Sequence, residues 1–235
     1  MKLLVLAGGF GTRLQSVVAE VPKALAPVGD VPFLRLQIEH WKNQGLKSFV
    51  FLLHHQADLI IDFLRNEQNG LLKDCDVQWL VEPMPMGTGG ALAYAVEHLN
   101  ISNDFLVTNA DTWLGTGIKE VWQAASPAMA VVRVGDAGRY GNVQFDDKNL
   151  ITAFHEKITT VGTGWINAGL CHLQADLFKD WNNEPFSLER DLFPIWADRG
   201  NFGAVPLESN FIDIGLPDDY SRLCRWIESQ KVGNL

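Results

Sequence analysis

Short apolar runs alternate with amphipathic segments through the first half of this chain, and this alternation limits its possible folds more than any other feature. Apolar runs of strand-forming residues predict buried strands at residues 3–7, 48–53, 77–81 and 105–108. Residues 33–44 and 57–66 instead place their apolar side chains along one face of a helix. Alternating strands and helices form a mainly parallel sheet that helices cover on both faces. We therefore predict a Rossmann-like α/β fold whose ligands bind beyond the carboxyl ends of the strands.

The second half of the chain is richer in strand pairs. Its pattern predicts strands at residues 129–134, 142–145 and 151–155, with residues 146–149 (DDKN) as the turn between the last two. Pro217 and the two aspartates after it predict the start of a helix, because proline suits the first helical position and carboxylates suit the positive end of the helix dipole. No linker or repeat interrupts the pattern. Residues 1–235 are therefore predicted to form one domain with a mixed, mainly parallel sheet flanked by helices.

Composition and charge exclude several classes of partner. The net charge is −9 and the 19 Lys and Arg residues are scattered, so the chain lacks the basic face of a nucleic-acid-binding protein. Gly8 and Gly9 interrupt the first apolar run too early for a signal peptide, and no segment is long enough to span a membrane. The three cysteines lie far apart without metal-ligand spacing, as free thiols in a reducing compartment do. We expect a cytoplasmic protein without nucleic-acid or membrane partners.

A glycine-rich segment, residues 6–14 (LAGGFGTRL), follows the first predicted strand. Its glycines let the backbone bend tightly and point N–H groups at an anion, which predicts a phosphate-binding loop. It is not a Walker loop, because no Gly-Lys-Ser/Thr follows, and Leu14 stands where the dinucleotide fingerprint has its third glycine. A simple strand-to-helix turn is the alternative, but such a turn needs neither so many glycines nor Arg13.

This loop begins a series of motifs that resembles the sugar-1-phosphate nucleotidyltransferase family and spans nearly the whole chain. In order, the motifs are 7–14 (AGGFGTRL), 21–28 (VPKALAPV), 32–34 (PFL), 87–91 (GTGGA), 109–112 (NADT), 139–141 (RYG), 156–157 (EK), 166–169 (INAG) and 211–215 (FIDIG). Within the family, residues 13–18 (RLQSVV), 187–193 (SLERDLF) and 211–220 (FIDIGLPDDY) are similar to those of heptose 1-phosphate guanylyltransferases. The resemblance implies the nucleotide-diphospho-sugar transferase fold, with a nucleotide-binding half at about 1–125 and a sugar-phosphate-binding half at about 126–235.

The activity implied by this resemblance is transfer of a nucleoside monophosphate to a sugar 1-phosphate with release of pyrophosphate. The expected substrates are GTP and D-glycero-D-manno-heptose 1-phosphate, for a nucleotide sugar used in cell-surface polysaccharide. Mannose 1-phosphate with GTP, or another sugar 1-phosphate with UTP or CTP, remains an alternative. A catalytically silent regulatory subunit that binds sugar nucleotides is an alternative of a different class, although such a protein is expected to lose charged groups that this chain retains.

The resemblance also assigns the residues that contact the nucleotide. They are Ala7, Gly8, Gly9, Gly11, Thr12, Arg13, Lys23, Glu82, Gly87 and Thr88. The expected catalytic residues are Arg13, Lys23 and Asp111. The planar fork of Arg13 suits the leaving pyrophosphate, and the compact charge of Lys23 suits the α-phosphate, although Lys23 could also be a solvated loop residue.

Magnesium is the expected cofactor, with Asp111 and Asp213 as its ligands. Each aspartate lies in or just after a short apolar run, where a carboxylate gains little from packing. Two hard oxygen ligands from distant segments suit Mg²⁺, which keeps waters and bridges substrate phosphates. The alternative is that the carboxylates cap turns.

For the acceptor, the resemblance assigns six residues: Asn109, Tyr140, Gly141, Glu156, Lys157 and Asn167. Lys157 is expected to meet the sugar phosphate, and Glu156 and Asn167 the sugar hydroxyls. The pair 156–157 could instead be exposed on a strand, since adjacent strand residues face opposite ways. For the base, the Glu82 carboxylate could accept two hydrogen bonds from guanine, or it could anchor its own loop through backbone N–H groups. The oligomeric state is left open, with a homo-oligomer possible.

Overall fold

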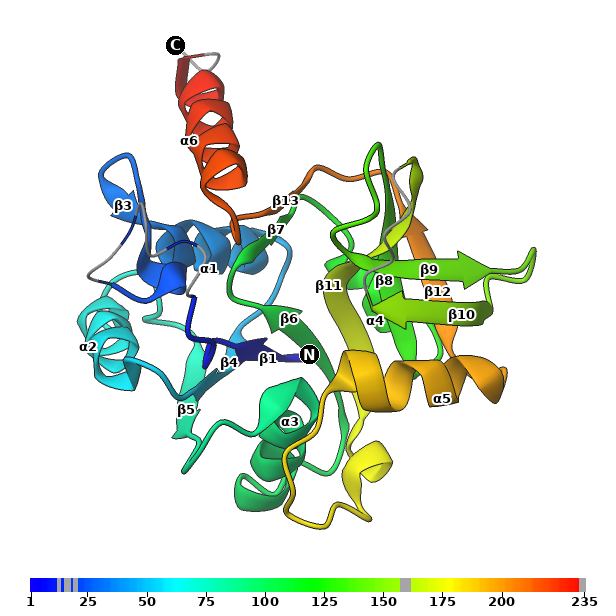
Figure 1. The fold of residues 1–235 in the computed structure, drawn as a ribbon. Helices are drawn as coiled ribbons and strands as arrows, with labels where there is room; N and C mark the ends of the chain where they lie inside the picture. The colour runs from blue at the N-terminus through cyan, green and yellow to red at the C-terminus, as the bar shows by residue number, and fades with distance from the viewer. Residues whose placement is uncertain (12–13, 15–17, 19–20, 157–161, 233–235) are drawn as a thin grey trace.

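The computed structural model describes residues 1–11, 14, 18, 21–156 and 162–232 (Figure 1). Its strands are β1 (Lys2–Leu6), β2 (Pro27–Val28), β3 (Val31–Pro32), β4 (Ser48–Leu53), β5 (Asp76–Val81), β6 (Asp104–Asn109), β7 (Thr112–Leu114), β8 (Ala128–Val134), β9 (Gly141–Phe145), β10 (Ile151–Glu156), β11 (Gly164–Gln174), β12 (Gly203–Leu207) and β13 (Phe211–Asp213). The α-helices are α1 (Phe33–Asn43), α2 (Ala57–Glu67), α3 (Gly87–His98), α4 (Ile118–Gln123), α5 (Phe193–Asp198) and α6 (Pro217–Val232). Short helical turns are η1 (Lys23–Leu25), η2 (Ala175–Phe178) and η3 (Leu188–Leu192).

One large mixed sheet extends through both halves of the chain. Its main path is β10-β9-β11-β6-β1-β4-β5, and β8 joins it beside β11 with β12 beyond. The ladders β1–β4, β1–β6 and β4–β5 are parallel, whereas β11 runs antiparallel to β6, β8 and β9. The prediction of a mixed, mainly parallel sheet flanked by helices is confirmed. Its antiparallel ladders are those of β11 with β6, β8 and β9 and that of β9 with β10.

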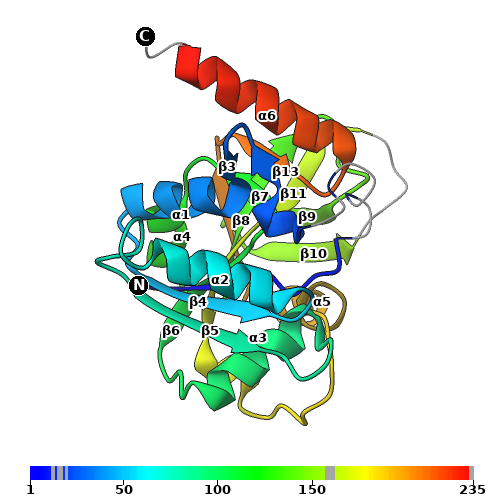
Figure 2. The same ribbon diagram turned by 90° about the vertical axis from the view of Figure 1, so that its left-hand side faces the viewer.

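Helices cover both faces of this sheet because its central strands bury side chains on both sides. Leu3 and Val5 of β1 join the core under α1 and α2, whereas Leu4 points the other way into the core shared with α3 and α5. Figure 2 shows the strand β4 between α2 above and α3 below. The helix α6 packs on a third core that includes Ile214 and Leu223 and lies over β13 and β7. No helix within the described residues is long and apolar enough to cross a membrane.

The predicted elements agree with those observed to within a residue or two at their ends. The strand at 48–53 and the helix start at Pro217 match their predicted positions. The turn at 146–149 forms as predicted, with the Asp146 carboxylate accepting the N–H groups of Lys148 and Leu150. The main additions are the strand β11, where the sequence pattern predicts no element, and helix α3, whose first residues the sequence indicates only as a glycine-rich binding segment.

Candidate functional site

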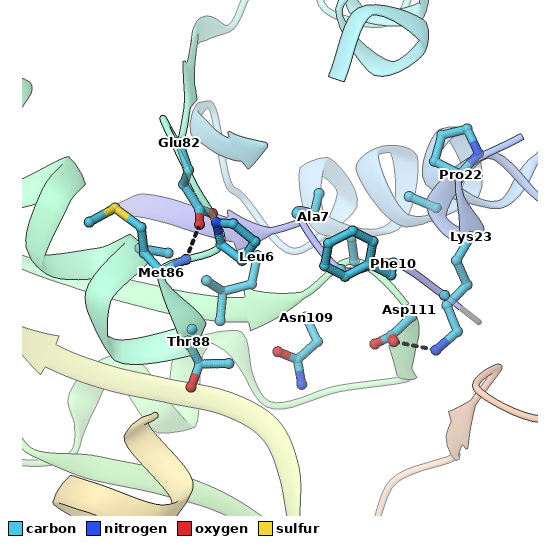
Figure 3. A pocket seen from close by; sticks show the side chains of 18 of the residues that line it. Leu6, Ala7, Phe10, Pro22, Lys23, Glu82, Met86, Thr88, Asn109 and Asp111 are labelled. Atoms are coloured by element: carbon cyan, nitrogen blue, oxygen red, sulfur yellow. Dashed lines mark hydrogen bonds and ion pairs between the residues drawn. The ribbon is translucent and has the colours of Figure 1, made fainter. Parts of the chain in front are cut away.

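A cavity of about 410 Å³ opens beyond the carboxyl ends of β1 and β6 (Figure 3). The described members of the predicted nucleotide-binding set all line it: Ala7, Gly8, Gly9, Gly11, Lys23, Glu82, Gly87 and Thr88. Asn109 and Asp111 also line it, from the end of β6 and just beyond. The site therefore forms where a parallel sheet is expected to bind ligands.

Lys23 and Asp111 form an ion pair at one end of this cavity. Lys23 Nζ lies 2.5 Å from Asp111 Oδ2, and the Lys23 side chain is mostly buried. The same ammonium lies near Asp213, because a Cβ atom placed on Gly215 would be 3.2 Å from Lys23 Nζ and 2.8 Å from Asp213 Oδ1. Gly215 thus permits a close approach of the three charged groups, although they come from distant segments of the chain.

The small sheet of β7 and β13 brings the two aspartates together. Asp213 pairs with Thr112, and the N–H of Ile214 donates to the carbonyl of Asp111 at 2.9 Å. The buried Gln37 of α1 supports this sheet, since its Nε2 donates to the carbonyl of Thr112 at 2.9 Å. The predicted metal ligands are therefore neighbours in space. One Asp213 oxygen also accepts the Gly215 N–H at 2.7 Å, which matches the turn-capping alternative.

Glu82 occupies the opposite end of the cavity and is almost fully buried. Its Oε2 accepts the N–H of Met86 at 3.0 Å, so Glu82 does anchor its own loop, as the alternative interpretation held. Its Oε1 lies beside Gly8, where an added Cβ would be 3.0 Å away. Burial raises the pKa of Glu82, and the Met86 N–H and the nearby His54 oppose that rise.

The glycines that begin α3 make room for Phe186, and Gly87 also lines the cavity. Phe186 packs on them so tightly that a Cβ added to Gly89 would lie 2.0 Å from its ring. The Phe186 carbonyl accepts the N–H groups of Gly89 and Gly90, at 3.0 and 3.2 Å. Two N–H groups at this helix start are therefore already satisfied by the segment that leads into η3.

A second cavity, of about 430 Å³, adjoins the first. The two cavities share the lining residues Gly87, Thr88, Asn109 and Glu189. The described members of the predicted acceptor-binding set all line the second cavity: Asn109, Tyr140, Gly141, Glu156 and Asn167. Asp213 lines it as well, so the charged cluster lies at the junction of the two spaces.

Several side chains of the second cavity are already held by neighbours. Asn167 Oδ1 accepts the Gly169 N–H at 2.8 Å, which leaves the amide nitrogen of Asn167 as the group able to donate to a ligand. Glu156 Oε2 lies 3.9 Å from Arg190 Nε. The Tyr140 hydroxyl accepts from Arg139 Nη2 at 3.0 Å, and burial raises the pKa of that hydroxyl.

Three residues of the sequence motifs that had no predicted role also line the site. Arg139 lines the second cavity and pairs with Asp219 of α6 at 2.9 Å. Glu189 and Arg190 enter from η3. The motif 187–193 was the only sequence feature that pointed to Glu189 and Arg190. It did not indicate that η3 folds back against the start of α3. Thr12, Arg13 and Lys157 lie outside the described residues, so their predicted roles stay predictions.

The donor set fits a hard divalent cation. Asp111, in the turn between β6 and β7, and Asp213, at the end of β13, supply carboxylate oxygens, and Mg²⁺ needs few protein ligands when substrate phosphates and waters complete its shell. No cluster of three or more His, Cys, Asp or Glu side chains with metal-binding geometry occurs among the described residues.

Comparison with known proteins places this geometry in context. The family described as Nucleotidyl transferase matches residues 2–230. A D-glycero-alpha-D-manno-heptose 1-phosphate guanylyltransferase from Campylobacter jejuni is 32% identical over 222 residues, which cover 94% of this chain and 97% of that protein. A probable mannose-1-phosphate guanylyltransferase from Oryza sativa is also 32% identical over 94% of this chain, but the chain spans only 63% of its length.

Among solved structures, HddC from Yersinia pseudotuberculosis is 33% identical, with a TM-score of 0.84 over 96% of this chain and 99% of that one. The same protein complexed with GMP-PN gives a TM-score of 0.82 with the same coverage.

Proposed function

The chain belongs to the nucleotidyl transferase family, and we propose that it transfers GMP from GTP to a heptose 1-phosphate, which releases pyrophosphate and forms a GDP-activated sugar. The predicted family is confirmed, and with it the enzyme class of sugar-1-phosphate nucleotidyltransferase. Guanine as the base is supported by the relatives named as guanylyltransferases and by the structural neighbour that binds GMP-PN.

One observation carries the proposal: two cavities meet beside Lys23, Asp111 and Asp213. A nucleotide in the first cavity and a sugar phosphate in the second would bring their phosphates to that junction. The charged groups needed for catalysis are retained there, which favours an enzyme over a silent regulatory subunit.

The reaction is an in-line displacement at the α-phosphorus of the nucleotide. An oxygen of the sugar phosphate forms a bond to the α-phosphorus as the bond to the oxygen between the α- and β-phosphorus atoms breaks, and pyrophosphate leaves with that electron pair. Lys23 neutralises charge on the α-phosphate, and Arg13, by its resemblance, neutralises the leaving pyrophosphate. Holding both anions in line accounts for much of the rate enhancement.

Mg²⁺ is part of the proposal, with Asp111 and Asp213 as the residues that would hold it. When bound, it supplies positive charge to the reacting phosphates. The Lys23 ammonium, which pairs with Asp111, is proposed to contact the α-phosphate of the bound nucleotide.

At the base end, Glu82 Oε1 beside Gly8 is proposed to accept a guanine N–H. In the second cavity, the Asn167 amide nitrogen and the Glu156 carboxylate are proposed to bind sugar hydroxyls. Lys157 is proposed to bind the sugar phosphate. The product is a sugar nucleotide for cell-surface polysaccharide, made in the cytoplasm.

A pyrophosphate-release screen tests this function. GTP, UTP and CTP are each combined with heptose 1-phosphate, mannose 1-phosphate and glucose 1-phosphate in the presence of Mg²⁺. We expect the highest kcat/KM for GTP with heptose 1-phosphate. A higher value with mannose 1-phosphate would assign the activity of the rice relative instead, and the highest value with UTP would refute the guanine assignment.

A further inference from the structure

Glu189 lies at the site but has no role in the proposed reaction. Glu189 lines both the nucleotide cavity and the sugar-phosphate cavity. Oε2 accepts the hydroxyl of Thr88 at 2.6 Å and the hydroxyl of Ser187 at 2.7 Å. Both donors reach the same oxygen, so Oε1 keeps its capacity to accept a hydrogen bond among the described residues.

The position of Glu189 is held from both sides. The Thr88 hydroxyl also accepts the backbone N–H of Leu188 at 2.9 Å, and the Ser187 hydroxyl accepts the N–H of Arg190 at 3.3 Å. These bonds join the start of α3 to η3. A carboxylate that is already held in place loses little further conformational entropy when a ligand binds. This suits a residue that selects between similar ligands.

A third hollow, of about 590 Å³, continues from the sugar-phosphate cavity. Glu156, Glu189 and Arg190 line both spaces and form the boundary between them. The hollow lies between β10 and the η3–α5 segment, which are adjacent in Figure 1. Its lining combines apolar Ala153, Phe154 and Pro194 with polar His155 and Asp198.

We propose that Glu189 accepts a hydrogen bond from the exocyclic chain of the sugar, and that the third hollow receives the end of that chain. This inference rests on the proposed function and assigns its acceptor specificity. A seven-carbon sugar 1-phosphate would reach the hollow, whereas mannose 1-phosphate lacks one CH(OH) group of that chain. Apolar side chains would contact its carbon atoms, and Glu189 and the polar rim would bind its hydroxyls.

The test compares two acceptors in the wild-type protein and in Glu189→Ala. With GTP as donor, kcat/KM is measured for D-glycero-D-manno-heptose 1-phosphate and for mannose 1-phosphate. We expect the wild type to favour the heptose acceptor by about tenfold or more, because a hydroxyl-binding site rejects an analogue that lacks the hydroxyl. Glu189→Ala should remove that preference, lower kcat/KM for the heptose acceptor and leave the mannose value within about threefold.

A matched control and a second readout separate recognition from a loss of structure. Glu184→Ala removes an exposed carboxylate on the segment before η3 and should leave both values unchanged. The Kd for GTP, measured by calorimetry, reports any effect of Glu189→Ala through its Thr88 partner, and such an effect lowers the values for both acceptors equally. Equal losses for both acceptors or a retained heptose preference would overturn the inference.

A second variant tests the hollow itself without removing a polar group. Ala153→Leu adds bulk to its floor and should reduce kcat/KM for the heptose acceptor while sparing mannose 1-phosphate. Thr152→Leu, at the exposed neighbouring position outside this lining, is its control. An unchanged heptose value in Ala153→Leu would contradict occupation of the hollow. A wild type inactive with both acceptors would refute the proposed function itself, whereas an active wild type without the predicted preference would refute only this inference.

Discussion

Asp111 pairs with Lys23 and lies near Asp213. Its negative charge stabilises the ion pair and would also bind the proposed Mg²⁺. Asp111→Asn keeps the shape of the side chain but removes that charge. We expect kcat to fall by roughly a hundredfold or more, on the order of 3 kcal/mol in transition-state stabilisation. Steady-state assays with and without excess chelator measure both effects. Exposed Asp74→Asn is the control, and full activity of the wild type in chelator would contradict the metal assignment.

Glu82 offers a test of base recognition, because it has one oxygen on the Met86 N–H and the other beside Gly8. Guanine presents two adjacent donors, whereas uracil presents one donor between carbonyls. Glu82→Gln should reduce the preference for GTP over UTP by about tenfold to hundredfold and spare kcat with saturating GTP. Exposed Glu97→Gln is the control. An unchanged preference would limit Glu82 to anchoring its loop.

The raised pKa of Glu82 gives this residue a definite pH dependence. Burial raises the pKa above 4.5, so the neutral carboxyl contributes stability that is fully present below pH 4.5 and is lost as the pH rises through the folded-state value. Chemical denaturation from pH 4.5 to neutrality should show the stability of wild type falling relative to Glu82→Gln. GTP affinity should change in the opposite sense, because guanine needs the ionised carboxylate. A pH-independent stability difference would contradict the burial effect.

At the scale of elements, the contact between α3 and the segment before η3 holds Glu189 in place. Alanine normally stabilises a helix relative to glycine, but a Cβ at Gly89 would lie 2.0 Å from the Phe186 ring. We therefore expect Gly89→Ala to lower the free energy of unfolding by about 1–3 kcal/mol and to weaken acceptor binding. Adding Phe186→Leu should restore part of the stability. Gly135→Ala, where a Cβ meets nothing within 4 Å, is the control for denaturant titrations, and a stabilised Gly89→Ala would contradict this packing.

The spacing of apolar residues predicted some strands and helices but not others. β4 and α1 were predicted because their side chains repeat with the periods of strands and helices. Helix α3 was not predicted, because four residues at its start, Gly87 to Gly90, include three glycines and have low helix propensity. Tertiary contact with Phe186 stabilises that start, and a contact between segments about 100 residues apart leaves no local period in the sequence.

At the scale of the whole molecule, the site is assembled from both halves of the sheet. Sequence motifs predicted that Lys23, Asp111 and Asp213 belong to one site. In the structure the β7–β13 pairing brings the two aspartates together, and Lys23 pairs with Asp111. The same reasoning gave Glu189 and Arg190 no role, because their importance depends on how η3 docks between two cavities. Motifs therefore indicated which charged residues share the site, whereas the docking of η3 between the two cavities could be seen only in the structure.

The most direct test of the central claim follows the oxygen atoms of the reaction. Heptose 1-phosphate carrying ¹⁸O in its phosphate is incubated with GTP, Mg²⁺ and the enzyme, and the products are examined by ³¹P NMR and mass spectrometry. If the two cavities join GMP to the sugar phosphate, GDP-heptose and pyrophosphate will form in equal amounts, with all of the label in GDP-heptose and none in pyrophosphate. Label in pyrophosphate, or release of GMP or GDP in place of a sugar nucleotide, would contradict the account.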